Sequence, residues 1–144
     1  MRFAVLHDGA VLPPWQERCL EALAAVPSCR AVGRLSPAAA AIPRLQSLAP
    51  DFILCFSAAP LPAALLALPM HGVWRFHLGD WLTYRGLPEG YWEVFDGCAA
   101  SAALLVRVQT DPDVVEVLRE GWLRTDVLSV RRNQEALFAR IAHG

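Results

Sequence analysis

One short stretch of the sequence, GVWRFHLGDWLTYRG over residues 72–86, gathers side chains that transfer protons and bind anions. Its apolar, β-branched and aromatic start predicts a strand that ends at His77, where a loop containing Gly79 begins. A histidine at the carboxyl end of a strand exchanges protons near neutral pH and donates a hydrogen bond to a developing oxyanion. His77 is therefore the first candidate for acid–base chemistry.

Arg75 precedes His77 by two residues, so on an extended strand both side chains leave the same side of the sheet. A guanidinium in that position is expected to lower the pKa of His77 and to favour neutral imidazole. It also offers a site for an oxyanion, a carboxylate or a phosphate. The simpler alternative is a salt bridge from Arg75 to Asp80 or Asp113.

A catalytic histidine needs a carboxylate partner, and the sequence offers acidic residues in two places. Asp80 is close to His77 in the chain. Asp113, together with Asp111, lies in a loop after a later strand, and a parallel sheet would bring that loop to the same edge as His77. The enzyme hypothesis requires the His77 ring and an Asp113 oxygen within hydrogen-bond reach, or one water apart, on the floor of an open cleft.

The elements that must position these residues follow from the hydrophobic pattern and the prolines. Apolar runs predict strands over residues 2–6, 29–35, 51–56, 73–77, 98–108 and 114–118. Helices are expected from Pro14 to Pro27, over 60–68 and from Ser129 to Ala142, while Pro43 should kink or split the alanine-rich segment before it. Strands that alternate with helices predict an α/β fold of three layers, a mostly parallel sheet with helices on both faces.

Composition limits the classes of function. The chain has 144 residues, and we expect residues 1–144 to form a single domain with a sizeable core. A net charge of -1 without a basic run argues against nucleic acid as a partner. The chain has no lysine, which excludes Schiff-base and pyridoxal phosphate chemistry. Charged residues are only 19% of the chain, which favours a surface partly covered by a partner, such as a homodimer.

The cysteines and the apolar segments predict a cytoplasmic protein without a membrane span. No CxxC spacing occurs among the four cysteines, so we expect them to be reduced and buried. Histidines and acids show no metal-ligand spacing, and no metal is expected. The apolar segment 59–70 is too short and too rich in proline to cross a bilayer.

The residues around His77 resemble the formyltransferase superfamily, which includes glycinamide ribonucleotide, methionyl-tRNA and sugar N-formyltransferases. That superfamily has a strand ending in Asn-x-His, then a loop H-P-S-L-L-P-x-Y-R-G, and later an aspartate. In this chain HLGDWLTYRG keeps the spacing from the histidine to Tyr84-Arg85-Gly86, and RVQTDPDVVEVLREGW has Asp113 where the aspartate falls. The pattern is most similar to a branch with GxWxFHxGD and YRGxPxGxWE, matched here by Gly72, Trp74, Phe76, His77, Gly79, Asp80, Tyr84, Arg85, Gly86, Pro88, Gly90, Trp92 and Glu93.

The resemblance implies a Rossmann-type α/β fold and a formyl transfer from 10-formyltetrahydrofolate to an amine of a small molecule or amino sugar, through a tetrahedral intermediate. It assigns His77 to acid–base chemistry and the oxyanion, and Asp113 to orienting His77. Arg75 stands where the superfamily has asparagine, and we expect it to act as an added electrostatic clamp. Val115 stands where a glycine follows the aspartate. The resemblance places cofactor binding at Asp80, Tyr84, Arg85 and Gly86.

Two other functions stay open at this point. One is a non-catalytic binding or interaction module that keeps the scaffold, and the other is a hydrolase in which His77 and Asp113 activate a water. His77 as a hydrogen-bonded structural residue and Asp113 as a turn aspartate are the corresponding structural alternatives.

Overall fold

The computed structural model describes residues 1–85 and 88–143, and these residues form two compact units. The first unit comprises Met1–Arg75 and Arg107–Glu116, and the second comprises Phe76–Val106 and Val117–Gly144. The strands follow the order β2-β1-β3-β4-β5-β6. The expectation of a single domain stays a prediction.

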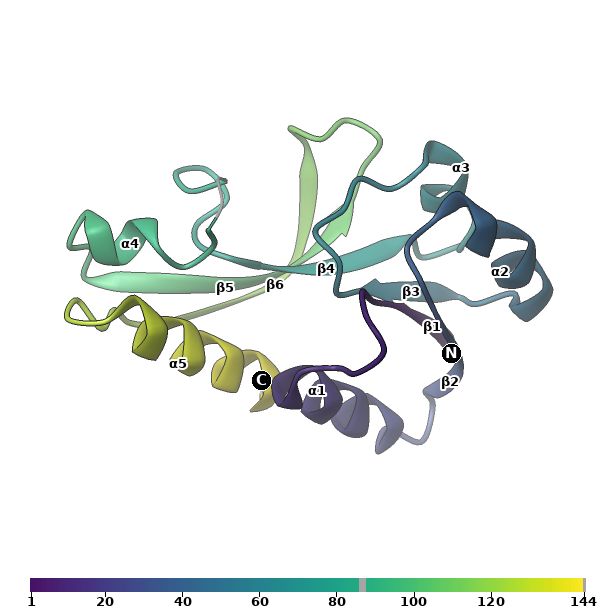
Figure 1. Cartoon of the computed structure of the whole chain (residues 1–144), viewed down its shortest axis with the longest axis horizontal. Coiled ribbons are helices and arrows are strands. Elements are labelled where there is room, and N and C mark those ends of the chain that lie inside the picture. Colours follow the sequence, from purple (N-terminus) through teal and green to yellow (C-terminus); the bar gives the residue numbers. More distant parts are fainter. Residues whose placement is uncertain (86–87, 144) are drawn as a thin grey trace. The chain divides into compact units, whose positions relative to one another are not determined.

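The first unit is a parallel α/β arrangement (Figure 1). Strand β1 pairs in parallel with β2 and β3, and β3 pairs in parallel with β4, with Phe3 opposite Phe52 and Ile53 opposite Val73. The connections between these strands contain helices, as parallel pairing requires. The elements are β1 (Arg2–Leu6), α1 (Pro14–Ala24), β2 (Arg30–Leu35), a 3-10 helix (Ala39–Ala41), α2 (Ile42–Leu48), β3 (Phe52–Cys55), α3 (Ala63–Leu66) and β4 (Val73–Leu78).

Helices cover both faces of these strands, because the side chains of a strand alternate between faces and both sets are apolar. On one face, Leu6 and Ile53 pack in a core with Leu45 of α2 and Leu65 of α3. On the other face, the rings of Phe3, Phe52 and Trp74 stack in a row, at centroid distances of 5.4 and 4.1 Å. Helix α1 lies on the side of the sheet opposite α2 and α3 (Figure 1). The three-layer prediction is confirmed in this unit.

Prolines open two of these helices, because the first helical position needs no N–H donor. Pro14 is the first residue of α1, as expected. Pro43 differs from the expectation of a kink, since it lies in the first turn of α2, directly after the 3-10 helix Ala39–Ala41. The alanine-rich segment therefore divides ahead of Pro43, and α2 itself is uninterrupted.

The second unit is antiparallel. Gly79, just after the end of β4, donates its N–H to Ala102 O near the start of β5, at 2.8 Å, so the two strands run in opposite directions. Thr125, just after β6, donates to Ala99 O before β5, so β5 and β6 also run in opposite directions. The elements of this part of the chain are α4 (Trp92–Phe95), β5 (Ala100–Val108), β6 (Val115–Arg124) and α5 (Val130–His143). Most of the strand pairs are parallel, and helices connect them, so the predicted α/β class is confirmed.

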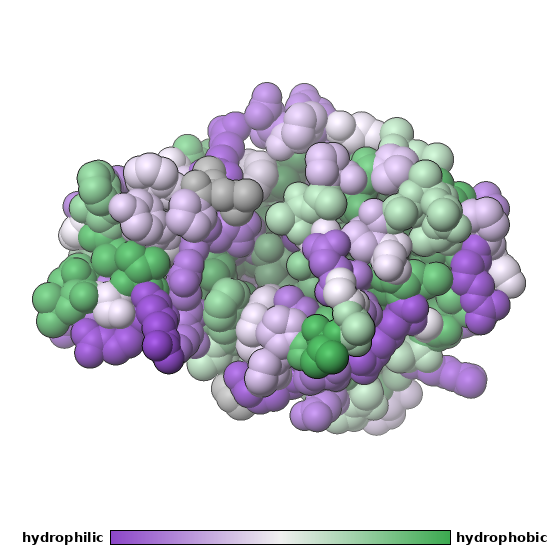
Figure 2. Space-filling model, in the orientation of Figure 1, coloured by the Kyte–Doolittle hydropathy of each residue, from purple (hydrophilic) through white to green (hydrophobic). Residues whose placement is uncertain are grey.

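Helix α5 packs on the strands of the second unit. Ser129 accepts the N–H of Arg132 at 3.2 Å, which confirms it as the cap of this helix. Leu137 is fully buried against Leu78 and Ala103. The segment between β6 and α5 leaves apolar residues in solvent, and green surface near α4 and the start of α5 is visible in Figure 2.

Candidate functional site

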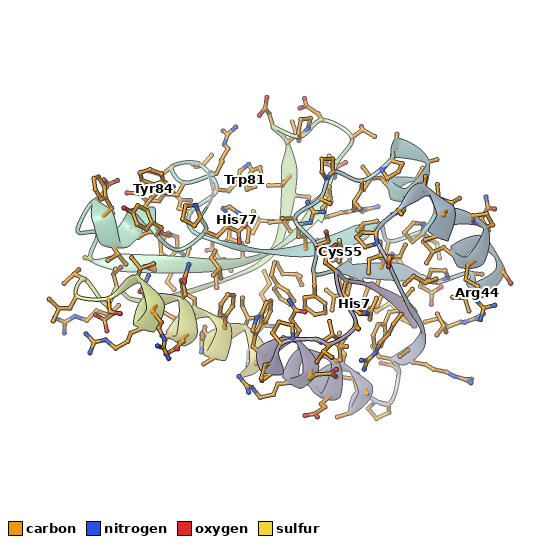
Figure 3. All side chains as sticks on the ribbon, viewed as in Figure 1. His7, Arg44, Cys55, His77, Trp81 and Tyr84 are labelled. Carbon is orange, nitrogen blue, oxygen red and sulfur yellow. The ribbon has the colours of Figure 1, made fainter. Side chains whose placement is uncertain are left out.

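His77 lies near the end of β4 and is only 4% exposed. Both of its ring nitrogens have partners within the second unit. Nδ1 lies 3.1 Å from Glu89 Oε1, and Nε2 lies 2.9 Å from the carbonyl oxygen of Tyr84. The ring also meets Trp81 edge-on, at a centroid distance of 4.9 Å. Figure 3 shows His77, Trp81 and Tyr84 on the same side of β4.

These partners determine the protonation of His77. A carbonyl oxygen only accepts hydrogen bonds, so Nε2 must carry a proton. The second oxygen of Glu89, Oε2, accepts the N–H of Leu78 at 3.2 Å, which suits a charged carboxylate. Burial lowers the pKa of His77, but the hydrogen bond and charge of Glu89, together with the Tyr84 carbonyl and Glu93, outweigh burial and raise it. The pairing with Glu89 therefore favours the protonated ring of His77, and the expected lowering of its pKa by Arg75 is wrong.

Helix α5 holds the segment that carries Glu89. Gln134 Nε2 donates to Glu89 O at 2.7 Å, and Asn133 Nδ2 donates to Gly90 O at 3.4 Å. Asn133 is fully buried and also bonds Ser101 Oγ at 3.0 Å, so α5 and β5 are tied to the same segment. The position of Glu89 beside His77 therefore depends on α5.

Glu93 is a second acidic neighbour of His77 and is 2% exposed. Neither of its carboxylate oxygens has a hydrogen-bond partner among the residues that the structure describes. Burial raises the pKa of Glu93, and the charges of Asp80 and Glu89 raise it further. The residue's own backbone N–H and the charge of His77 oppose them. A Cβ atom on Gly79, whose φ is +112°, would lie 3.0 Å from Glu93 Oε1. The close approach of this carboxylate to the backbone thus requires glycine at position 79.

The predicted cofactor-binding residues form the loop itself. Asp80 accepts hydrogen bonds from Thr83 Oγ1 at 2.9 Å and from Leu82 N at 3.4 Å, which fixes the turn after β4. Arg85 Nε donates to Trp81 O at 3.1 Å, and its guanidinium lies over the Trp81 ring. Gly86 lies outside the described residues.

The hydroxyl of Tyr84 is engaged at the other end of this loop. It lies 2.8 Å from Asp96 Oδ2 and 3.0 Å from Cys98 Sγ. These hydrogen bonds, with Cys98 first, raise the pKa of Tyr84. Whether the loop binds a cofactor stays a prediction.

Arg75 belongs to the first unit. Its Nη2 donates to Ala59 O at 2.9 Å and lies 3.6 Å from Cys55 Sγ, while its buried Nε has no partner in the described part of the chain. The side chain is therefore anchored to the loop that follows β3. Its role as an electrostatic clamp stays a prediction.

Asp113 lies in the exposed loop between β5 and β6, also in the first unit. Its N–H bonds Asp111 Oδ1 at 2.9 Å, which is the local turn expected of such a segment. We expected a parallel sheet to bring the loop of Asp113 to the same edge as His77. That reasoning is wrong, because β5 runs antiparallel to β4. The two residues fall in different units, so their meeting stays a prediction.

Sequence reasoning missed Glu89 and Glu93 as the acidic neighbours of His77. Glu93 was part of the matched motif. The sequence signal for both residues was the presence of two glutamates in the otherwise apolar and aromatic segment PEGYWEVF. No group of three or more histidine, cysteine or acidic side chains among the described residues has a metal-binding arrangement. The four cysteines are all free thiols, and no helix in the described ranges is long and apolar enough to cross a membrane.

Comparison with known proteins shows what the fold resembles. No family profile and no curated protein sequence matches the chain. Among solved structures, phosphoribosylglycinamide formyltransferase from Anaplasma phagocytophilum is 13% identical with a TM-score of 0.84, covering 99% of this chain and 82% of that one. The Brucella melitensis enzyme of the same name is 12% identical with a TM-score of 0.81, covering 99% and 90%.

A third similar structure belongs to a different formyltransferase. Methionyl-tRNA formyltransferase from Clostridium thermocellum is 12% identical with a TM-score of 0.67, covering 96% of this chain and 61% of that one. All three of these structures are formyltransferases. The chain therefore has a formyltransferase-like, Rossmann-type α/β fold.

Proposed function

We propose that this chain transfers a formyl or related one-carbon acyl group from a folate donor to an amine of a small molecule or amino sugar. The observation that carries the proposal is the His77–Glu89 pair near the carboxyl end of β4, on a formyltransferase-like fold. In open α/β sheets the carboxyl ends of strands are where ligands bind. The protonated form of His77, which Glu89 favours there, supplies positive charge and an N–H donor.

Formyl transfer uses both of these. The amine nitrogen attacks the formyl carbon, and the carbonyl oxygen becomes an oxyanion. The carbon–nitrogen bond to the donor then breaks as the proton lost by the attacking nitrogen passes to the leaving nitrogen. The Nε2–H of His77 now donates to the Tyr84 carbonyl oxygen. An oxyanion is a stronger acceptor than a carbonyl, so in our proposal the oxyanion replaces Tyr84 O as the partner of this N–H. Glu89 keeps the imidazolium charged throughout.

The roles of two further residues complete the proposal. Asp113 would orient His77 or a water, and Arg75 would act as an electrostatic clamp. The Arg75 guanidinium has a buried Nε without a partner among the described residues, which leaves it one N–H to donate. The simplest use of this buried N–H of Arg75 is a hydrogen bond to a separate binding partner.

In our proposal the folate donor binds at Glu93. A folate ring presents N–H donors along one edge, and a carboxylate accepts two parallel hydrogen bonds. Glu93 has two buried oxygens without partners in the described residues and lies near His77. We assign Glu93 to hold the donor, which when bound supplies the formyl group. Asp80, Tyr84, Arg85 and Gly86 remain the other residues predicted to bind the cofactor.

The test combines binding and transfer. The wild-type chain is expected to gain thermal stability with 5-formyltetrahydrofolate, because a ligand that binds only the folded state stabilises it by mass action. With 10-formyltetrahydrofolate and a panel of amino sugars, mass spectrometry should show a formylated product. His77→Gln should abolish the product and keep ligand binding. Absence of both the shift and the product in the wild-type chain would overturn the proposal.

A second candidate function is favoured by one observation. Both ring nitrogens of His77 are already engaged within the protein, as expected of a structural residue. On this basis the chain would be a binding module that keeps the scaffold without transfer. Ligand stabilisation that is unchanged in His77→Gln, with no formylated product in either protein, would favour this candidate over the enzyme.

A further inference from the structure

Strand β6 is the last strand in the sheet order, so one of its edges has no neighbouring strand in the described chain. It is also the longest strand, from Val115 to Arg124. Apolar side chains on it are exposed: Val117 by 46%, Leu118 by 38% and Trp122 by 48%. A long, apolar edge strand is a template for pairing with another strand.

The hydrogen bond from Thr125 N to Ala99 O shows which residues face outward. Hydrogen bonding alternates along a strand, so the odd-numbered residues of β6 bond to β5. The even-numbered residues, including Leu118, Glu120 and Trp122, therefore direct their N–H and C=O groups away from the sheet. These groups are available to a partner strand.

We propose that two copies of this chain pair through β6 as antiparallel strands, with the two-fold axis at Glu120. The residues that carry this pairing, 117–123, all belong to the second unit. In this register Val117 of one copy faces Leu123 of the other, and Leu118 faces Trp122. A two-fold interface repeats each pair, so four apolar pairs flank the axis. Cross-strand aromatic and aliphatic pairs of this kind stabilise antiparallel sheets.

The neighbouring registers are worse. A shift of two residues in one direction places Val117 opposite Gly121 and Leu118 opposite Glu120. The opposite shift places Leu118 opposite Arg124 and Glu120 opposite Trp122. Each sets apolar side chains against charges or glycine, so self-complementarity selects the register centred on Glu120.

The selected register has one unfavourable contact that provides a test. Glu120 faces Glu120 of the other copy, and like charges directly opposite one another destabilise a strand pair. Glu120→Gln removes this repulsion while keeping the size of the side chain. The dissociation constant of the dimer should fall about threefold to fivefold in this variant.

The oligomeric state is measured by sedimentation velocity over a wide range of concentration. The wild-type chain should dimerise, and Leu118→Lys should raise the dissociation constant at least about tenfold, since each copy sets a charge against Trp122. Leu128→Lys is the matched control, because Leu128 is 85% exposed and lies outside β6. It should leave the dimer intact. Circular dichroism checks that both variants fold.

Disulfide trapping tests the register independently of affinity. Directly opposed residues of this kind have Cα atoms about 5.5 Å apart, within reach of a disulfide. Glu120→Cys should therefore yield a covalent dimer under mild oxidation, whereas Val117→Cys, which faces Leu123, should not. The proposal would be overturned if both the wild-type chain and the Glu120→Gln variant stayed monomeric at every concentration. It would also be overturned by equal trapping of the two cysteine variants.

Discussion

The buried ring of His77 pairs with the partly exposed carboxylate of Glu89 across twelve residues of chain, with Nδ1 3.1 Å from Oε1. Glu89 also accepts the N–H of Leu78, so one carboxylate fixes both the imidazole and the backbone beside it. The other ring nitrogen is bound by Tyr84 O. The loop after β4 is therefore organised around His77, whose protonated form Glu89 favours.

Glu89→Gln is expected to lower the pKa of His77, because it leaves burial without the carboxylate that offsets it. The ring should then titrate below the ordinary histidine range in a proton NMR titration. The variant should lose about 1–3 kcal/mol of unfolding free energy at pH 6. A raised histidine pKa stabilises the fold fully below its unfolded pKa and loses that effect as pH rises through the folded pKa.

The difference between wild type and Glu89→Gln should therefore shrink towards high pH. Glu135→Gln serves as the control, since Glu135 is exposed and pairs only with Arg131 in the contacts observed here. It should change stability by less than about 0.5 kcal/mol at any pH. An unchanged His77 titration in Glu89→Gln would show that the pair does not set the protonation of the ring.

Glu93→Leu is expected to stabilise the protein by about 1–3 kcal/mol at pH 7, because it removes a buried carboxylate without partners. The sign follows from the raised pKa: wild-type stability is greatest below the ordinary glutamate pKa and falls as pH rises towards the folded value. Urea unfolding should show a steeper decline in wild type than in Glu93→Leu, which keeps only the decline that His77 contributes. The same variant should lose its response to 5-formyltetrahydrofolate. A destabilised Glu93→Leu would contradict the unpartnered state of this carboxylate.

Gly79→Ala should cost about 2–3 kcal/mol of unfolding free energy, since the backbone has φ of +112° and the new Cβ meets Glu93 Oε1 and Tyr84 O. Gly97→Ala is the matched control. Gly97 also has a positive φ, of +68°, but nothing lies within 4 Å of the added atom. It should cost about 1 kcal/mol, the price of the backbone conformation alone. Equal losses in the two variants would show that contact with Glu93 is unimportant.

The buried part of the fold was readable from the sequence because its strands are short apolar runs. Phe52–Cys55 lies between helices and was predicted within one residue at each end. Strand β6 was predicted only over 114–118, although it continues to Arg124. Its second half, LREGWLR, is charged and exposed and lacks the alternation of a half-buried strand. An edge strand of this kind leaves little hydrophobic signal.

The candidate site was readable only in part, for a different reason. His77 was located correctly because a strand ending in a loop has a local signature. Its partner Glu89 comes from the far end of that loop, and its placement depends on Gln134 of α5. Such a contact depends on tertiary packing. Asp80 and Asp113 were the acidic candidates that the sequence suggested, but the carboxylate observed at Nδ1 of His77 is Glu89, which no spacing rule selects.

Asn133 provides the sharpest test of how α5 positions Glu89. Its side-chain amide donates to Ser101 Oγ and Gly90 O, and its Oδ1 accepts the N–H of Asp126. Asn133→Ala leaves these buried groups unpaired, so the unfolding free energy should fall by about 2–4 kcal/mol. The loosened segment should also weaken the His77–Glu89 pair and lower the pKa of His77 in an NMR titration. Glu135→Ala, on the same helix but exposed, should change neither quantity. A stable Asn133→Ala variant with an unshifted His77 would mean that the loop holds Glu89 without help from α5.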